Sequence, residues 1–112
     1  MKLAVVSPYV SNYPNPIRFG AGESVITGRT DDEFPGWIWC KTADANEGWA
    51  PEVLLRKTTE RTAVTTADYT AHELNTKAGD ALEGLKTLNG WIWCRDQSGC
   101  EGWVPEKSVK PV

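Results

Sequence analysis

The 112-residue chain has few of the residues that build metal sites or disulfide frameworks. It contains three cysteines and one histidine, His72, and it has no Cys-x-x-Cys pair. An odd number of cysteines argues against a disulfide framework, and a zinc site needs several Cys or His ligands at short spacing. We therefore expect no metal and no cofactor.

The N-terminal segment lacks a long hydrophobic run. The apolar stretch 3–6 is followed at once by Ser7 and Pro8. A signal-peptide core needs about 7–15 apolar residues, and a membrane-spanning helix needs about 20. We expect a cytoplasmic protein with no membrane partner.

An excess of basic residues is also missing. Twelve Lys and Arg stand against 15 Asp and Glu, which gives a net charge of −3. A protein that grips a phosphate backbone usually carries a basic face, so we expect no nucleic acid partner. The sequence also shows no nucleophile paired with a base and no carboxylate pair typical of a catalytic cleft, so we expect no enzyme.

The chain is instead rich in tryptophan, and all six tryptophans belong to an internal repeat. GWIWC occurs at 36–40 and again at 90–94, followed by GWAPE at 48–52 and GWVPE at 102–106. The offset between the two copies is about 60 residues at Tyr9 and Tyr69, about 57 at the Ala-Gly-acid turns 21–23 and 78–80, and about 54 at the tryptophans. The second copy has therefore lost about three residues at each of two places. The deletions predict two loops, at 10–20 and 29–35 in the first copy and at 70–77 and 86–89 in the second.

The repeat predicts two domains, 1–57 and 58–112. The joint at 56–61 is polar and short, and it has no glycine or proline. A domain of about 50 residues buries only about 60% of its unfolded surface and is marginal alone. We expect the two halves to pack on each other.

Neither copy shows helical periodicity over three turns, and short strand-like runs bounded by Gly, Pro, Asn and Asp occur instead. Five such runs in each copy predict an all-β fold of two tandem five-stranded barrels. The runs are 3–7, 24–28, 37–42, 48–50 and 54–57 in the first copy, and 62–66, 81–85, 91–95, 101–104 and 108–110 in the second.

Strand alternation separates the core residues from the tryptophans. In GWIWC, the isoleucine and cysteine share one face, which we expect to point inward, and the two tryptophans share the other. The tryptophan of G-W-x-P should also point outward and lie across a hairpin from the first pair. Three outward tryptophans in each copy predict an interaction surface.

The order of these motifs resembles that of an SH3 domain. In the second copy, 67–71 (ADYTA) resembles the end of the ALYDY signature, and 73–80 resembles its EL…GD continuation. Trp91 then matches the first tryptophan of the SH3 pair, and 102–105 matches Gly-x-x-Pro. The first copy, through 9–16 (YVSNYPNP), resembles bacterial variant SH3 domains, so that nearly the whole chain resembles a bacterial tandem SH3 protein.

The resemblance implies a groove that binds proline-rich peptides between aromatic side chains. Acidic loop residues of such a groove usually face a basic ligand residue. Both copies depart from the family at two aromatic positions of the groove, which hold Ser7 and Leu54 in the first copy and Ala67 and Ser108 in the second. The residues implied for ligand binding are Tyr9, Tyr13, Asp31, Asp32, Glu33, Trp37 and Pro51 in the first copy and Asp68, Tyr69, Glu73, Trp91 and Pro105 in the second.

Three functions follow as hypotheses. The first is a non-catalytic module that stacks a protein or peptide partner, proline-containing with a basic residue, on Tyr9, Tyr13 and Trp37. The second is a structural subunit or scaffold whose aromatic faces are used up between the halves or in a homodimer. The third is cell-wall binding, as in secreted bacterial SH3-like domains. For the scaffold, the interface residues are Trp39, Trp49, Trp93 and Trp103.

Overall fold

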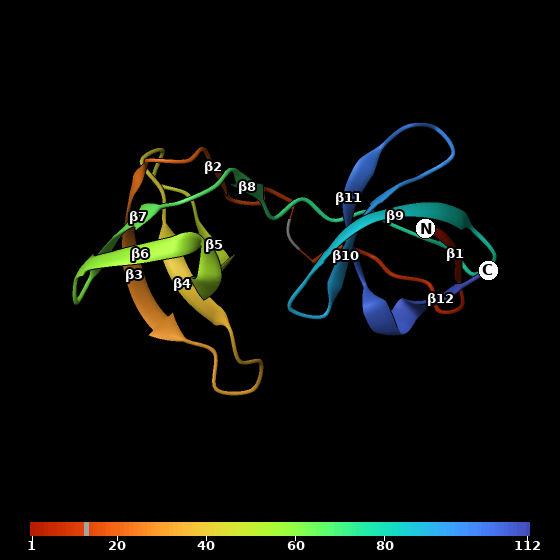
Figure 1. The fold of residues 1–112 in the computed structure, drawn as a ribbon, viewed down its shortest axis with the longest axis horizontal. Coiled ribbons are helices and arrows are strands. Elements are labelled where there is room, and N and C mark those ends of the chain that lie inside the picture. The colour runs from red at the N-terminus through yellow and green to blue at the C-terminus, as the bar shows by residue number, and fades with distance from the viewer. Residues whose placement is uncertain (13) are drawn as a thin grey trace. The chain divides into compact units, whose positions relative to one another are not determined.

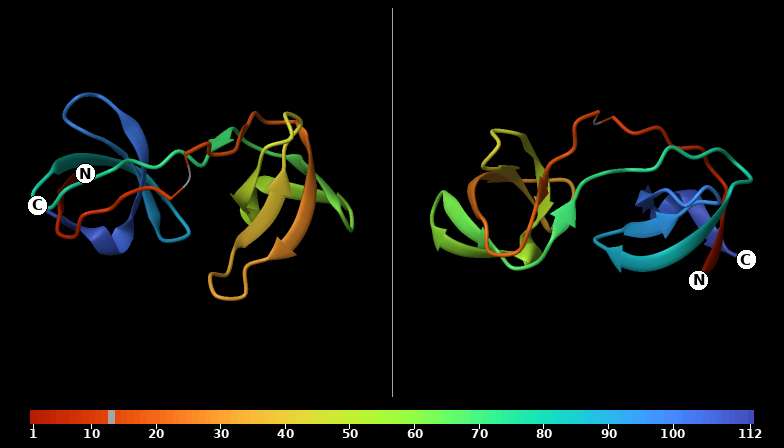
Figure 2. Two further views of the ribbon diagram at one scale, coloured as in Figure 1. Left: turned by 180° about the vertical axis from the view of Figure 1, so that it is seen from behind. Right: turned by 90° about the horizontal axis from the view of Figure 1, so that it is seen from above.

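The computed structural model describes residues 1–12 and 14–112, which form two compact units. Unit 1 consists of Met1–Pro14 and His72–Val112, and unit 2 is the continuous segment Asn15–Ala71. The chain therefore passes from unit 1 to unit 2 between residues 14 and 15, and returns between residues 71 and 72 (Figure 1 and Figure 2). Tyr13, one of the implied ligand-binding residues, lies outside the described residues.

Unit 2 contains a five-stranded antiparallel sheet in the order β5-β4-β3-β7-β6. A separate antiparallel pair joins β2 to β8. The 3₁₀ turn η1 (Glu52–Leu54) links β5 to β6. The strands are β2 (Arg18–Phe19), β3 (Ser24–Thr30), β4 (Trp37–Lys41), β5 (Glu47–Pro51), β6 (Leu55–Thr59), β7 (Thr62–Thr65) and β8 (Tyr69–Thr70).

Unit 1 contains an equivalent five-stranded antiparallel sheet in the order β11-β10-β9-β1-β12. The 3₁₀ turn η2 (Glu106–Ser108) links its last two strands. The strands are β1 (Lys2–Val5), β9 (Ala81–Leu88), β10 (Trp91–Arg95), β11 (Glu101–Pro105) and β12 (Val109–Pro111).

The first strands of the two sequence copies have exchanged places. β1 lies between β9 and β12 of the second copy, whereas β7 lies between β3 and β6 of the first. The registers match: Leu3 pairs with Leu82 in unit 1, and Ala63 pairs with Val25 in unit 2. Each unit thus combines the first strand of one copy with the remaining strands of the other. The compact units differ in this way from the sequence halves 1–57 and 58–112.

The short joint between the copies explains why β7 stays with the first copy. Only Glu60 and Arg61 separate β6 from β7, and the two strands form a hairpin. A two-residue connection places its strands side by side and antiparallel. The polar joint 56–61 therefore forms most of β6 and the turn of a hairpin inside unit 2. The place that β1 would take in the first copy is already filled by β7.

The expected alternation is confirmed for the core positions of GWIWC in both units, but Trp103, which was expected to lie open on the outer face, is only 5% exposed. Ile38 and Ile92 are buried, and the four tryptophans beside them on β4 and β10 are half-buried. Cys40 and Cys94 are fully buried. The core of unit 1 forms a cluster of Leu3, Val5, Leu74, Leu82, Ile92, Cys94 and Val104.

All ten expected strands occur, with ends shifted by a few residues. The short strand β2 lies inside the expected loop 10–20, and its partner β8 overlaps the start of the expected loop 70–77. β9 also runs through most of the expected loop 86–89, so that only the turn Asn89–Gly90 remains before β10. Both turn residues have positive φ, 49° and 86°, which is the backbone of a tight hairpin turn.

Within the described part of the chain, no helix is long and apolar enough to cross a membrane. Over the same residues, the structure holds no group of three or more His, Cys, Asp or Glu side chains arranged to bind a metal ion.

Candidate functional site

An aromatic pair lies at the surface of unit 1. Tyr9 follows β1, and its backbone exchanges two hydrogen bonds with Thr76, of 3.0 and 2.8 Å. The Tyr9 ring packs on the Trp91 ring in a T-shaped arrangement, with ring centroids 5.8 Å apart and planes at 80°. Edge-to-face packing of this kind is favourable for aromatic rings. Both side chains remain half-buried.

An acidic side chain completes this pair. The Tyr9 hydroxyl donates a hydrogen bond of 2.7 Å to Oε1 of Glu73. Across the hairpin of β10 and β11, Trp91 is the cross-strand partner of Pro105. Four of the implied ligand-binding residues, Tyr9, Glu73, Trp91 and Pro105, belong to one unit, and we call them the unit 1 groove residues. Pro105 is itself buried, as is its counterpart Pro51 in unit 2.

This grouping corrects the expected one. The sequence placed Tyr9 with Trp37, because both are in the first copy. The structure places Tyr9 in unit 1 beside Trp91, and Trp37 in unit 2, where it pairs with Pro51. The cause is the strand exchange, since Tyr9 travels with β1. Membership of the same sequence copy therefore did not predict which tyrosine packs on which tryptophan.

The tyrosine of unit 2 has a different environment. Tyr69 is only 9% exposed and packs on Phe19, with ring centroids 5.5 Å apart. The two residues are also cross-strand partners in the β2–β8 pair. Thr76 stands at the position of Phe19 in the other copy, so Tyr9 has no equivalent aromatic partner there and packs on Trp91 instead. Unit 2 thus uses its tyrosine as a core residue.

The acidic residues implied for ligand binding in unit 2 stabilise loops. One oxygen of the Asp31 carboxylate accepts backbone N–H bonds from Glu33 and Phe34, of 2.9 and 3.0 Å. The Asp68 carboxylate accepts a hydrogen bond of 2.9 Å from the N–H of Ala21. The Asp31 bonds are turn bonds of the kind that Asp commonly makes, whereas the Asp68 bond joins two segments that are far apart in the sequence. The side chains of Asp32 and Glu33 are exposed in the same loop as Asp31.

The remaining tryptophans pair within their own units, on the outer faces of the two sheets. Trp39 packs edge-to-face on Trp49, and Trp93 packs edge-to-face on Trp103, each with centroids 5.2 Å apart. One cation covers each pair: the Arg29 guanidinium lies 5.2 and 5.3 Å from its two rings. The ammonium of Lys86 lies 5.7 and 5.8 Å from the other two.

These cations were not anticipated from the sequence, although a signal was present. Arg29 and Lys86 are equivalent positions of the repeat, and both follow the Ala-Gly-acid turn by the same number of residues. A cation over the face of tryptophan is attracted by the ring quadrupole. An interface role for the four tryptophans stays a prediction, because the contacts described here lie inside each unit.

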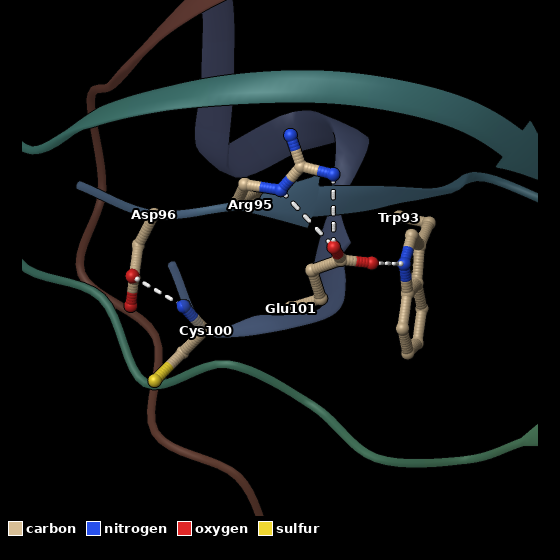
Figure 3. A network of polar contacts seen from close by, with 5 residues as sticks. All are labelled: Trp93, Arg95, Asp96, Cys100 and Glu101. Atoms are coloured by element: carbon tan, nitrogen blue, oxygen red, sulfur yellow. Dashed lines mark hydrogen bonds and ion pairs between the residues drawn. The ribbon is translucent and has the colours of Figure 1, made fainter. Parts of the chain in front are cut away.

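The Trp93 pair is also fixed at its polar edge (Figure 3). The Trp93 indole N–H donates a bond of 2.8 Å to Glu101, whose other oxygen accepts from Arg95 Nε at 3.0 Å. These two contacts hold the pKa of Glu101 below its ordinary value, with the indole bond as the larger cause. In the adjacent turn, the Asp96 carboxylate accepts the N–H of Cys100 at 3.0 Å.

Two of the three cysteines, Cys40 and Cys94, are buried in the cores of the units. Burial raises the pKa of the Cys40 and Cys94 thiols to about 11. A thiol with such a pKa is protonated at neutral pH and is a poor nucleophile. Cys100 is exposed at the end of a hairpin turn. The two buried cysteines are therefore core residues, as the alternation indicated.

Comparison with known proteins gives one match. Residues 4–57 match the family model of the variant SH3 domain. Comparisons with curated proteins and with solved structures gave no match. The matched range begins in β1 of unit 1 and continues through β6 of unit 2, so it follows the sequence copy. The all-β structure is consistent with an SH3-like fold, and SH3 domains are generally non-catalytic modules that bind proteins or peptides.

Proposed function

We propose that the chain is a tandem SH3-like interaction module that binds a short peptide at the unit 1 groove residues. The observation that supports this most directly is the packing of Tyr9 on Trp91 with Glu73 bonded to the tyrosine hydroxyl. Aromatic faces of this type accept the apolar surface of an extended, proline-containing peptide. The partner is therefore a protein or peptide segment.

The carboxylate of Glu73 would select a basic residue on that peptide. An ionised carboxylate has about four acceptor sites on its two oxygens, and the Tyr9 hydroxyl uses one of them. A Lys or Arg next to the bound proline could donate to the others. Unit 2 is the weaker candidate, because Tyr69 is buried on Phe19 and is lost as a wall of its groove.

Selection of binders from a library of random proline-containing peptides tests this function on the full chain. The strongest binder would be titrated into the native protein, Trp91→Ala and the unit 2 counterpart Trp37→Ala, after circular dichroism has shown that both variants fold. A central aromatic residue contributes about 2 kcal/mol or more at such a site, so Trp91→Ala should weaken binding at least about tenfold. Trp37→Ala should leave it unchanged.

The charge preference is tested with the same peptide. Glu73→Gln should weaken binding of a peptide with Lys or Arg and should have little effect once that residue is replaced by norleucine. A library that returns no binder, or binders insensitive to Trp91→Ala, would contradict the proposed function.

A further inference from the structure

The side chains of β1 are matched to unit 1 by size. Leu3 is 2% exposed and packs in the core cluster with Leu82 and Ile92. Gly84 lies beneath it: a Cβ at this position would be only 3.0 Å from Cδ1 of Leu3. The absence of a side chain at Gly84 therefore provides the space that Leu3 fills.

At the equivalent position of unit 2, the small residue is on the first strand and the larger residue is on the neighbouring strand. The N–H of Thr27 donates to the carbonyl of Arg61 at 2.8 Å, just as Gly84 donates to Met1 at 2.7 Å, so Thr27 is the counterpart of Gly84. Thr27 is buried, and the strand residue that corresponds to Leu3 is the smaller Ala63. A leucine placed there would meet the Thr27 side chain, and overpacking of this kind is destabilising.

A second position distinguishes the two strands by polarity. The Thr65 hydroxyl donates to the carbonyl of Gly20 at 2.6 Å and accepts the N–H of Glu23 at 2.8 Å. Its counterpart on β1 is Val5, which packs in the apolar cluster of unit 1. Valine in place of Thr65 would leave both backbone groups without this partner, which is costly for partly buried groups. β1 therefore fits unit 1 and not unit 2.

The two strands differ in how firmly the chain holds them. The two-residue turn Glu60–Arg61 keeps β7 beside β6. Residues 6–17, which include Pro8, Pro14 and Pro16, connect β1 to β2 of unit 2. Prolines fix φ and favour an extended connection over one that folds back. β1 pairs only with β9 and β12 of unit 1, so its release would leave the sheet of unit 2 intact.

We propose that residues 1–14 can be exchanged between two copies of the chain, which gives a reciprocal strand-exchanged homodimer. Unit 1 of a second copy presents the same space above Gly84, the same apolar cluster and the same edges of β9 and β12. Exchange of an identical element re-forms every contact of the closed monomer and is a low-cost route to dimers. Tyr9 moves with β1, so each groove would take Tyr9 from one copy and Trp91 from the other.

The proposal does not depend on peptide binding and is tested with the full chain by cross-strand disulfides. Ala4 and Ala81 are cross-strand partners on β1 and β9, so Ala4→Cys with Ala81→Cys would link these strands. The control is Ser24→Cys with Val64→Cys, the counterpart pair on β3 and β7. Both are made in a Cys100→Ser chain, since Cys100 is an exposed thiol. Circular dichroism checks that each variant folds.

The native chain and both variants are refolded at about 1 mM, near the effective concentration of a short tether, and about a hundredfold lower. Size-exclusion chromatography separates the species, and non-reducing gels locate the disulfides. The dimer-to-monomer ratio of the native chain should rise in proportion to concentration. In the dimer, the 4–81 bond should join two chains, whereas the 24–64 bond should stay within one. A monomer at both concentrations, or a dimer with the 4–81 bond inside one chain, would overturn the proposal.

Discussion

The two units carry the same tryptophan motif but cover it differently. Trp103 is 5% exposed, whereas its counterpart Trp49 is half-buried. In unit 1, the carbonyl of His72 accepts the N–H of Trp103 at 2.9 Å, and the N–H of Leu74 donates to the Trp103 carbonyl at 3.1 Å. In unit 2, the carbonyl of Asn15, the counterpart of His72, instead accepts from the side chain of Asn46 at 3.0 Å.

This comparison shows that a repeated motif fixes the strands and leaves their surroundings open. The segments that contain Asn15 and His72 determine whether the tryptophan of G-W-x-P, Trp49 or Trp103, is covered or open. The chain crosses between the units at the start of these segments, between residues 14 and 15 and between residues 71 and 72. These crossings determine that Tyr9, rather than Tyr69, lies beside Trp91. The structural differences between the units described here therefore arise in the connections rather than in the Gly-Trp strands.

The largest expected loss of stability follows from truncation of a core side chain in unit 1. Leu3→Ala removes a side chain that is 2% exposed, and such a truncation costs about 2–5 kcal/mol. Urea unfolding followed through the amide NMR signals of each unit should show unit 1 lost first. Ile26→Ala on β3 is the control, because Ile26 is 55% exposed and should change stability by less than about 0.5 kcal/mol. Equal loss of both units would contradict the placement of β1.

A smaller effect is expected from the space beneath Leu3. Gly84→Ala should cost about 1–3 kcal/mol by overpacking, because its Cβ would lie 3.0 Å from Leu3. Gly28→Ala on β3 is matched to it, since its nearest neighbour would be at an ordinary 3.6 Å, and should have little effect. Adding Leu3→Val to Gly84→Ala should recover part of the lost stability. Thermal unfolding of the four chains would measure this, and failure of the rescue would argue against the Leu3–Gly84 contact.

The equivalent hairpin turns of the two units, which contain Ala45 and Gly99, should respond to substitution with opposite changes in stability. Ala45 in unit 2 has a φ of 66°, and Gly99 occupies the same turn position in unit 1 with a φ of 92°. A left-handed conformation costs a residue with a Cβ about 1–2 kcal/mol, and glycine adopts it freely. Ala45→Gly should therefore stabilise the protein by roughly 1 kcal/mol, and Gly99→Ala should destabilise it by a similar amount, as measured by urea unfolding. Changes of the same sign would show that the turns are not equivalent.

The smallest expected effect concerns the pKa of Glu101. Its folded value lies below the ordinary 4.5, chiefly because of the Trp93 indole and then because of Arg95. The stabilisation by these bonds is present above the unfolded pKa and is lost as the pH falls through the folded pKa. Trp93→Phe should raise the pKa of Glu101 more than Arg95→Met does, as read from the carboxyl carbon in a pH titration by NMR. The reverse order would place the main interaction on the ion pair.

Much of this fold follows from sequence pattern. Alternation in GWIWC correctly predicts that Ile38 and Cys40 lie in the core, and the deletions between the copies indicate where the loops are. Ala50 and Val104, each at 0% exposure, confirm the inward positions of G-W-x-P. The alternation is local, so a single copy of the motif is enough to predict it, whereas the loop positions require a comparison of both copies.

The exchange of strands could not be predicted in this way. β1 and β7 have the same position in the repeat, so the pattern is equally consistent with either sheet. The distinguishing signals are a size match between Leu3 and Gly84 and the two-residue length of the Glu60–Arg61 turn. Both are visible in the sequence only once the pairing of strands is known. The packing of Tyr9 on Trp91 depends on the exchange and was missed for the same reason.

Methyl and amide NOE measurements on the native chain test the strand exchange most directly. The exchanged structure predicts NOEs between the methyl groups of Leu3 and the Hα and amide protons of Gly84. It predicts none between those methyl groups and Thr27, the counterpart of Gly84 in unit 2. NOEs from Leu3 to Thr27, with none to Gly84, would show that each copy keeps its own first strand and would contradict the account.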